Sequence, residues 1–127
     1  MKIEIRAILK ILELKDYDPR MAPGEVLVWV NPTRVFLARR DEAMREIPRA
    51  AVKDEESIAM ARERLEIFNM QMFDWYAELW SQGEDPEMRW TADEIRELSE
   101  VDPSCFNWLV RESARLLREH RIGEKKS

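Results

Sequence analysis

Residues 54–82 read DEESIAMARERLEIFNMQMFDWYAELWSQ, and this stretch decides the fold. Asp54 is a typical helix N-cap, and apolar side chains then recur at alternating spacings of three and four residues. They are Ile58, Ala61, Leu65, Phe68, Met72, Trp75 and Leu79. The spacing predicts one long helix from Glu55 to about Gln82, ended by Gly83 in a left-handed conformation. Its apolar stripe is either a core face or the seam of a coiled coil with a second copy, which would make the chain a homo-oligomer.

Three shorter helices are predicted around this one. The first runs to about Ile47 and stops at Pro48, the second carries Ile95, Leu98 and Val101, and the third ends at Gly123. Their starts are marked by Thr33, by Thr91 in a capping box with Glu94, and by Asp102 ahead of Pro103. The other side chains expected to face the core are Val35, Phe36, Ala43, Met44, Ile47, Phe106, Leu109, Val110, Leu116 and Leu117.

The first 32 residues have the pattern of an antiparallel β-hairpin. Lys2–Ala7 alternates charged and apolar side chains and Glu25–Val30 is rich in β-branched ones, so both are predicted strands. Residues 8–14 fit either a buried strand or a helical turn, and residues 15–24 form a loop with two prolines and a glycine. Because a lone hairpin is marginal in water, the helices must cover one face.

A length of 127 residues suits one domain. The sequence predicts an α+β, mainly α fold: an N-terminal antiparallel β-hairpin (1–32), then a bundle of about four helices including one long helix (33–122), and a flexible tail (123–127).

Charge and hydropathy exclude several classes of partner. The net charge is −5, with 10 basic and 8 acidic side chains in residues 1–50 and 11 basic and 18 acidic ones in residues 51–127. A nucleic-acid binder needs a basic face, so no nucleic-acid partner is expected. No apolar run is long enough to cross a membrane, and charges interrupt the N-terminal segment too often for a signal peptide, so a cytoplasmic location is expected.

Catalytic and metal-binding patterns are absent from the sequence. Cys105 and His120 lie 15 positions apart, which is no zinc-ligand spacing, and three glycines leave no phosphate-binding loop. The acidic pairs (Asp41 with Glu42, Glu55 with Glu56, Asp93 with Glu94) are expected at helix starts and on solvated faces. His120 is expected to act as a cation near a helix end, and Cys105 as a small buried residue rather than a nucleophile. The sequence therefore predicts a non-enzymatic protein without metal or cofactor.

The long helix is apolar beyond its stripe, since Met60, Ile67, Met70, Phe73, Tyr76 and Trp80 lie off it. Either the hairpin covers this second face or a partner protein does. Met, Trp and Tyr are favoured at adaptable binding surfaces. The candidate protein-binding residues are Phe68, Met72, Phe73, Trp75, Tyr76 and Trp80, with Trp29 and Trp108 as outer candidates.

Two short stretches add a resemblance. Val28–Thr33 (VWVNPT), preceded by Leu12–Tyr17 (LELKDY) and followed by a helical half with Trp80, Trp90 and Trp108, resembles the small tail assembly chaperones of long-tailed bacteriophages and prophages. The resemblance implies a non-enzymatic protein of the host cytoplasm. Such a protein keeps the tape measure protein soluble and helps recruit tail tube protein. It also implies a longer form made by ribosomal frameshifting, and no catalytic residue.

The alternative is a small acidic helical adaptor or regulatory protein that binds a basic protein partner. Such binding weakens steeply with salt, whereas binding of apolar helices resists salt. An enzyme that works through Cys105 is a more distant alternative.

Overall fold

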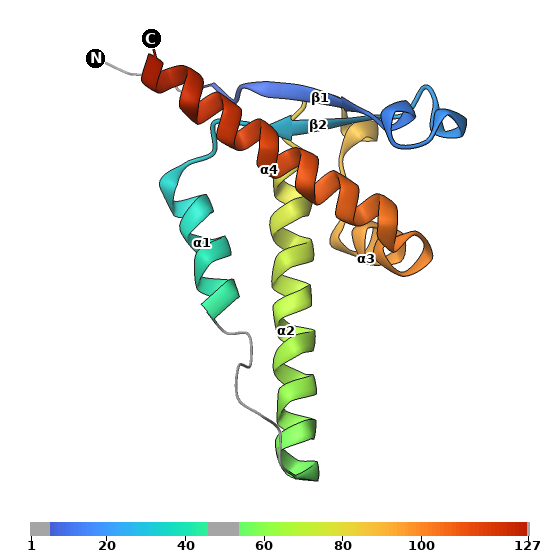
Figure 1. Cartoon of the computed structure of the whole chain (residues 1–127), viewed down its shortest axis with the longest axis vertical. Helices are drawn as coiled ribbons and strands as arrows, with labels where there is room; N and C mark the ends of the chain where they lie inside the picture. The colour runs from blue at the N-terminus through green and yellow to red at the C-terminus, as the bar shows by residue number, and fades with distance from the viewer. Residues whose placement is uncertain (1–5, 46–53, 127) are drawn as a thin grey trace.

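The computed structural model describes residues 6–45 and 54–126. In chain order these form β1 (Leu9–Glu13), β2 (Glu25–Trp29), α1 (Arg34–Arg45), α2 (Glu55–Leu79), α3 (Ala92–Val101) and α4 (Pro103–Lys126), with short 3₁₀ helices at Leu14–Asp16, Pro19–Met21 and Pro86–Met88. Figure 1 shows α4 crossing the hairpin, while α1 and α2 run away from it. The predicted class, an α+β and mainly α fold with an N-terminal hairpin, is confirmed.

The hairpin presents one apolar face to α4. β1 and β2 pair antiparallel, with Leu12 opposite Val26 and Lys10 opposite Val28. Leu12, Val26 and Val28 are buried, and both strands contact α4. Ile11 lies on the other face and is 55% exposed. As predicted, a helix covers one side of the hairpin.

The first strand differs from the prediction. β1 occupies the segment that fitted either a strand or a helical turn, whereas Arg6 and Ala7 are outside any strand and residues 2–5 lie outside the described residues. The Asn31 side chain accepts from the Ile8 backbone N–H (2.6 Å) and donates to the Arg6 carbonyl (2.9 Å). An amide side chain thus takes the place of a paired strand there.

The helix starts follow the predicted caps. The side chains of Thr33, Asp54, Thr91 and Asp102 each accept a hydrogen bond from the backbone N–H three residues later, over 2.7–3.2 Å. The Glu94 carboxylate completes the box by accepting from the Thr91 backbone N–H. These side chains satisfy backbone donors that have no partner within the helix.

The end of α2 corrects the prediction. The helix ends at Leu79 rather than Gln82, because Trp80 leaves the helical conformation and enters the core. Gly83 is not left-handed. A Cβ atom at Gly83 would lie 2.7 Å from Leu27 Cδ1, so glycine permits a close approach to β2 instead.

Two further expectations are wrong. α4 continues through Gly123 to Lys126, so residues 123–126 are helical rather than a tail, and Ser127 lies outside the described residues. Of the side chains expected in the core, Val35, Met44 and Val101 are exposed, because no described element covers that side of their helices. The predicted end of α1 near Ile47 falls outside the described residues.

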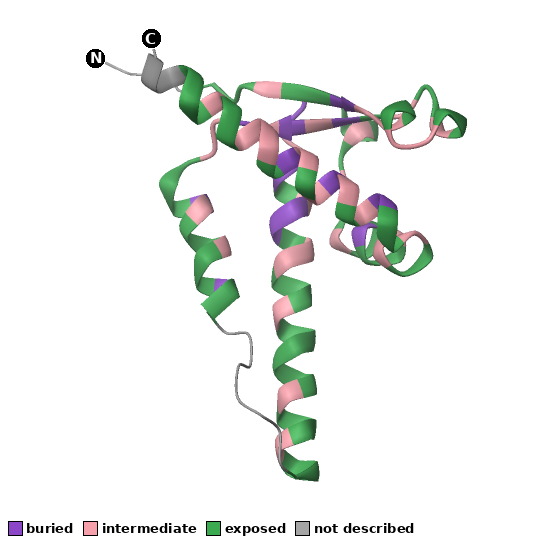
Figure 2. Cartoon of the chain, viewed as in Figure 1, coloured by how far each residue is buried: buried purple, intermediate pink, exposed green. Residues whose placement is uncertain are grey.

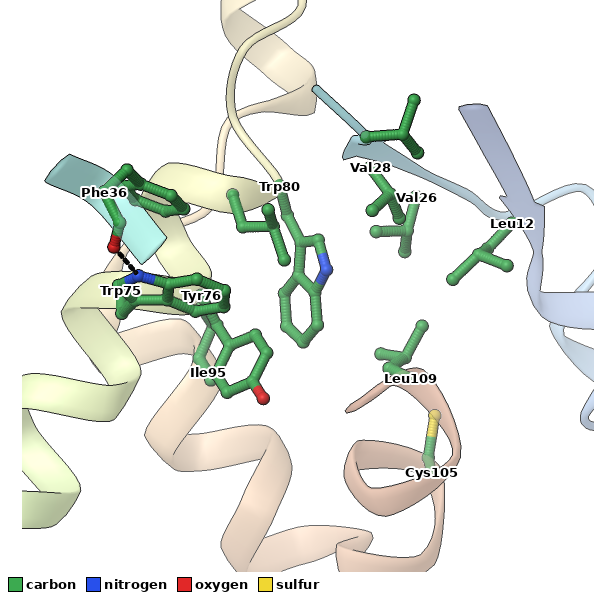
Figure 3. Close-up of a cluster of buried hydrophobic side chains, with 12 residues drawn as sticks. Leu12, Val26, Val28, Phe36, Trp75, Tyr76, Trp80, Ile95, Cys105 and Leu109 are labelled. Atoms are coloured by element: carbon green, nitrogen blue, oxygen red, sulfur yellow. Dashed lines mark hydrogen bonds between the residues drawn. The ribbon is translucent and has the colours of Figure 1, made fainter. Parts of the chain in front are cut away.

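The core lies where the C-terminal end of α2 meets the hairpin, α3 and α4 (Figure 3). Trp75 Nε1 donates to the Phe36 carbonyl over 2.7 Å, and the two rings stack with centroids 4.6 Å apart. Trp80 Nε1 donates to Ser113 Oγ over 3.0 Å, and all the atoms of this bond are buried. These two tryptophans, whose N–H groups are both hydrogen-bonded, therefore fix the C-terminal end of α2 to the rest of the molecule. We call that rest, made of the hairpin, α1, α3 and α4, the body.

Candidate protein-binding surface

The N-terminal part of α2 projects from the body of the molecule. Figure 2 shows burial confined to the end of α2 nearest the hairpin. The buried side chains of this 25-residue helix are Trp75, Tyr76 and Leu79, and none between Glu55 and Asp74 is buried. We call residues 55–71 the α2 arm. At 1.5 Å per residue the arm is about 25 Å long.

The arm carries large apolar side chains in solvent. Those with at least two fifths of their surface exposed are Ile58 (41%), Met60 (51%), Leu65 (47%), Ile67 (49%) and Met70 (63%). At 100° per residue, Ile58 and Leu65 continue the stripe that is buried farther along at Leu79, whereas Met60 and Ile67 lie on the opposite side. Two faces of the arm are therefore apolar and without a partner among the described residues.

A cleft of about 470 Å³ separates the arm from α1. Ile67 and Met72 of α2 and Ala43 of α1 supply its apolar lining. Arg39 bridges to Glu78 over 3.1 Å, and the Arg40 guanidinium lies 5.3 Å from the centre of the Trp75 ring. The cleft thus combines an apolar lining with a charged rim, which suits an amphipathic segment.

The structure corrects three of the predicted contact residues. Trp75 is 2% exposed, Tyr76 8% and Trp80 0%. Burial raises the pKa of Tyr76, which is consistent with a phenol inside the core. These three side chains hold the fold together and offer no surface to a partner.

The other five predicted residues are half-buried and do not form one site. Phe68 and Met72 lie on α2 along the stripe, at and next to the end of the arm. Phe73 packs edge-on against Phe106 of α4, with ring centroids 6.0 Å apart. The remaining two lie against other parts of the body: Trp29 packs on Phe36, and Trp108 packs on Tyr17.

Sequence reasoning missed the apolar residues with the most exposure on the arm. The sequence assigns Ile58 and Leu65 to either a core face or a coiled-coil seam, because their spacing is the same as that of Leu79. Met60, Ile67 and Met70 lie off the stripe, and this excess of apolar residues is the sequence signal for a second surface.

The reactive side chains elsewhere in the described part of the chain are not arranged as a catalytic or metal-binding site. Cys105 is fully buried, and desolvation raises the pKa of its thiol, the reverse of what activates a nucleophile. Within residues 6–45 and 54–126 no group of three or more His, Cys, Asp or Glu side chains could hold a metal ion.

Comparison with protein-family models, with curated proteins and with solved structures finds no match to this chain. In the described part of the chain, no helix has the length and hydropathy needed to span a membrane.

Proposed function

We propose that this chain is a non-enzymatic tail assembly chaperone of a long-tailed bacteriophage or prophage, and that the α2 arm binds an apolar helical segment of the tape measure protein. The observation that carries the proposal is the arm itself, a projecting helix with five large apolar side chains in solvent. The resemblance of Val28–Thr33 and Leu12–Tyr17 to that family supplies the identity of the client and the role in recruiting tail tube protein.

The arm suits an elongated helical client. An amphipathic helix docks by placing its apolar positions into grooves along another helix, and the arm offers apolar faces on two sides. Two of its residues, Met60 and Met70, have flexible side chains that adapt to different sequences. Such a surface fits a protein that must hold many successive segments of one long client.

The affinity expected from the arm for a single client segment is weak. Burying a Leu, Ile or Met side chain completely contributes about 1.5–3 kcal/mol, so completing the burial of half of each contributes about 1 kcal/mol. Five such side chains give about 5 kcal/mol before the cost of association, so one segment is expected to bind with a Kd of about 0.2 mM or weaker. Weak affinity for each segment lets a chaperone release its client.

The test mixes the chain with the tape measure protein encoded beside it and measures how much client stays in the supernatant. The variant is Leu65→Glu with Ile67→Glu, which places charge on both faces of the arm. Val35→Glu is the matched control, because Val35 is 73% exposed on α1 and lies outside the arm. We expect the double variant to raise the chain concentration needed for half-maximal client solubilisation by about 100-fold. The control should leave that concentration unchanged.

The same mixture separates this function from the acidic adaptor. Binding through the arm should persist between about 50 mM and 500 mM NaCl, since apolar contacts are little screened. A partner that is basic, and whose binding collapses over that range while the double variant still binds it, would establish the adaptor instead. Equal solubilisation by the double variant and the parent chain would refute the role of the arm.

A further inference from the structure

A second cleft, of about 710 Å³, lies on another part of the molecule from the α2 arm. One wall is the segment 30–34 with the start of α1, and the other wall is the C-terminal half of α4. Val30, Leu37 and Leu117 contribute apolar lining. In Figure 1 the start of α1 and this half of α4 lie near the hairpin, whereas the arm extends away from it.

The cleft is strongly basic in a chain of net charge −5. Its lining includes Arg34, Arg40, Arg118, Arg121 and His120. None of the described residues that line it is acidic. Arg34, Arg118 and Arg121 form no ion pair with any described residue. Arg40 Nε is buried without a hydrogen-bond acceptor in the described part of the chain, and it lies 3.8 Å from Asp41 Oδ1. Arginines from two helices thus line one cavity.

Favourable interaction with a helix dipole explains the position of only some of these arginines. Arg118 and Arg121 lie toward the C-terminus of α4, where the helix dipole favours cations. Arg34 is the first residue of α1, where the dipole disfavours a cation, and the first turn of α1 contains no acidic residue. The helix start and the Arg34 side chain therefore both favour an anion in the cleft.

We propose that this cleft binds an acidic peptide segment of a partner protein, with carboxylates held by the arginines and apolar side chains held against Leu37 and Leu117. Arginine forks match carboxylates in a bidentate geometry, and the apolar lining accepts the side chains between them. A long polyanion such as a nucleic acid fits less well, because outside the cleft the acidic surface of the chain repels it. Arg40 also lines the cleft beside the α2 arm, but Arg34, Arg118 and Arg121 do not, and this proposal does not rest on the function proposed for the arm.

The test measures fluorescence anisotropy of a short fluorescein-labelled peptide of alternating glutamate and leucine, at about 50 mM ionic strength. The parent chain is compared with Arg118→Gln combined with Arg121→Gln. Arg111→Gln is the matched control, because Arg111 is exposed on the same helix and does not line the cleft. Circular dichroism establishes that each variant is folded.

We expect the double variant to bind the peptide at least about tenfold more weakly than the parent chain, and the Arg111→Gln control to bind within about twofold. A peptide with glutamine in place of glutamate should bind far more weakly. Equal binding of the glutamine peptide, or equal binding by the double variant and the control, would overturn the proposal. So would a single-stranded DNA oligonucleotide that binds more tightly than the peptide and depends on the same two arginines, since the ligand would then be a nucleic acid.

Discussion

Leu65 and Leu79 make a matched pair for testing whether the α2 arm is free of the body. Both lie on the same stripe of the same helix, two heptads apart, and both can be changed to alanine. Leu79 is fully buried, whereas Leu65 is 47% exposed. If the arm projects in solution as it does in the structure, the two substitutions must differ in their effect on the free energy of unfolding.

The magnitudes follow from burial. Leu→Ala removes three carbon atoms, and in a closed core it also leaves a cavity, so Leu79→Ala should lower the free energy of unfolding by about 3 kcal/mol. Leu65 is about half exposed, so its substitution loses only about half of the free energy of burying the side chain and leaves no enclosed cavity. Leu65→Ala should therefore lower the free energy of unfolding by about 1 kcal/mol. With a slope of about 1.5 kcal/mol per molar urea, the midpoints should fall by about 2 M and about 0.7 M.

The assay is urea unfolding followed by far-ultraviolet circular dichroism, at two protein concentrations that differ tenfold. A loss for Leu65→Ala as large as that for Leu79→Ala would refute the reasoning, because Leu65 would then be buried in the native state. A midpoint that rises with protein concentration would identify a second copy as what buries it.

Three further outcomes are expected. Ser113→Ala removes the acceptor for Trp80 Nε1 and should cost about 1–3 kcal/mol in the same urea assay, because a buried donor is left unpaired. Cys105 should react with iodoacetamide at least about tenfold more slowly in the folded chain than in denaturant, since it is fully buried and its pKa is raised. Hydrogen bonds from Ser57 lower the pKa of Asp54 in the folded chain, so its contribution is present above the ordinary value of 3.8 and is lost as the pH falls through the lower folded value. Acidification from about pH 5 to pH 2 should therefore reduce helix content more in the parent chain than in Asp54→Asn, which keeps an N-cap that does not titrate.

Features set by a few neighbouring residues could be predicted from the sequence. The N-caps at Asp54 and Thr91 depend on a side chain and a backbone N–H three residues away, and both were located correctly. The first strand was misplaced, because alternation at residues 2–7 says nothing about which segment β2 pairs with. The sequence predicts a left-handed Gly83, but the role of this glycine depends on Leu27, which is distant in sequence.

In the candidate surface too, local features could be predicted from the sequence, whereas features that depend on distant residues could not. Ile58 and Leu79 occupy equivalent positions of one heptad pattern, and only the extent of neighbouring elements decides which of them is covered. Trp75 and Trp80 have the residue type of an interface anchor, yet the nearby carbonyl of Phe36 and the hydroxyl of Ser113 satisfy them inside the core. Periodicity reports that a helix has an apolar face and carries no information about how far the body extends along it.

The tryptophans divide the molecule into two parts that can be observed separately. All five lie outside the α2 arm, and Trp75 and Trp80 are fixed in the core where the arm begins. Intrinsic fluorescence therefore reports on the body alone, and fraying of the arm changes the helical dichroism without changing the emission. A tryptophan placed at Met60 would give the arm a fluorescent signal of its own, distinct from that of the core.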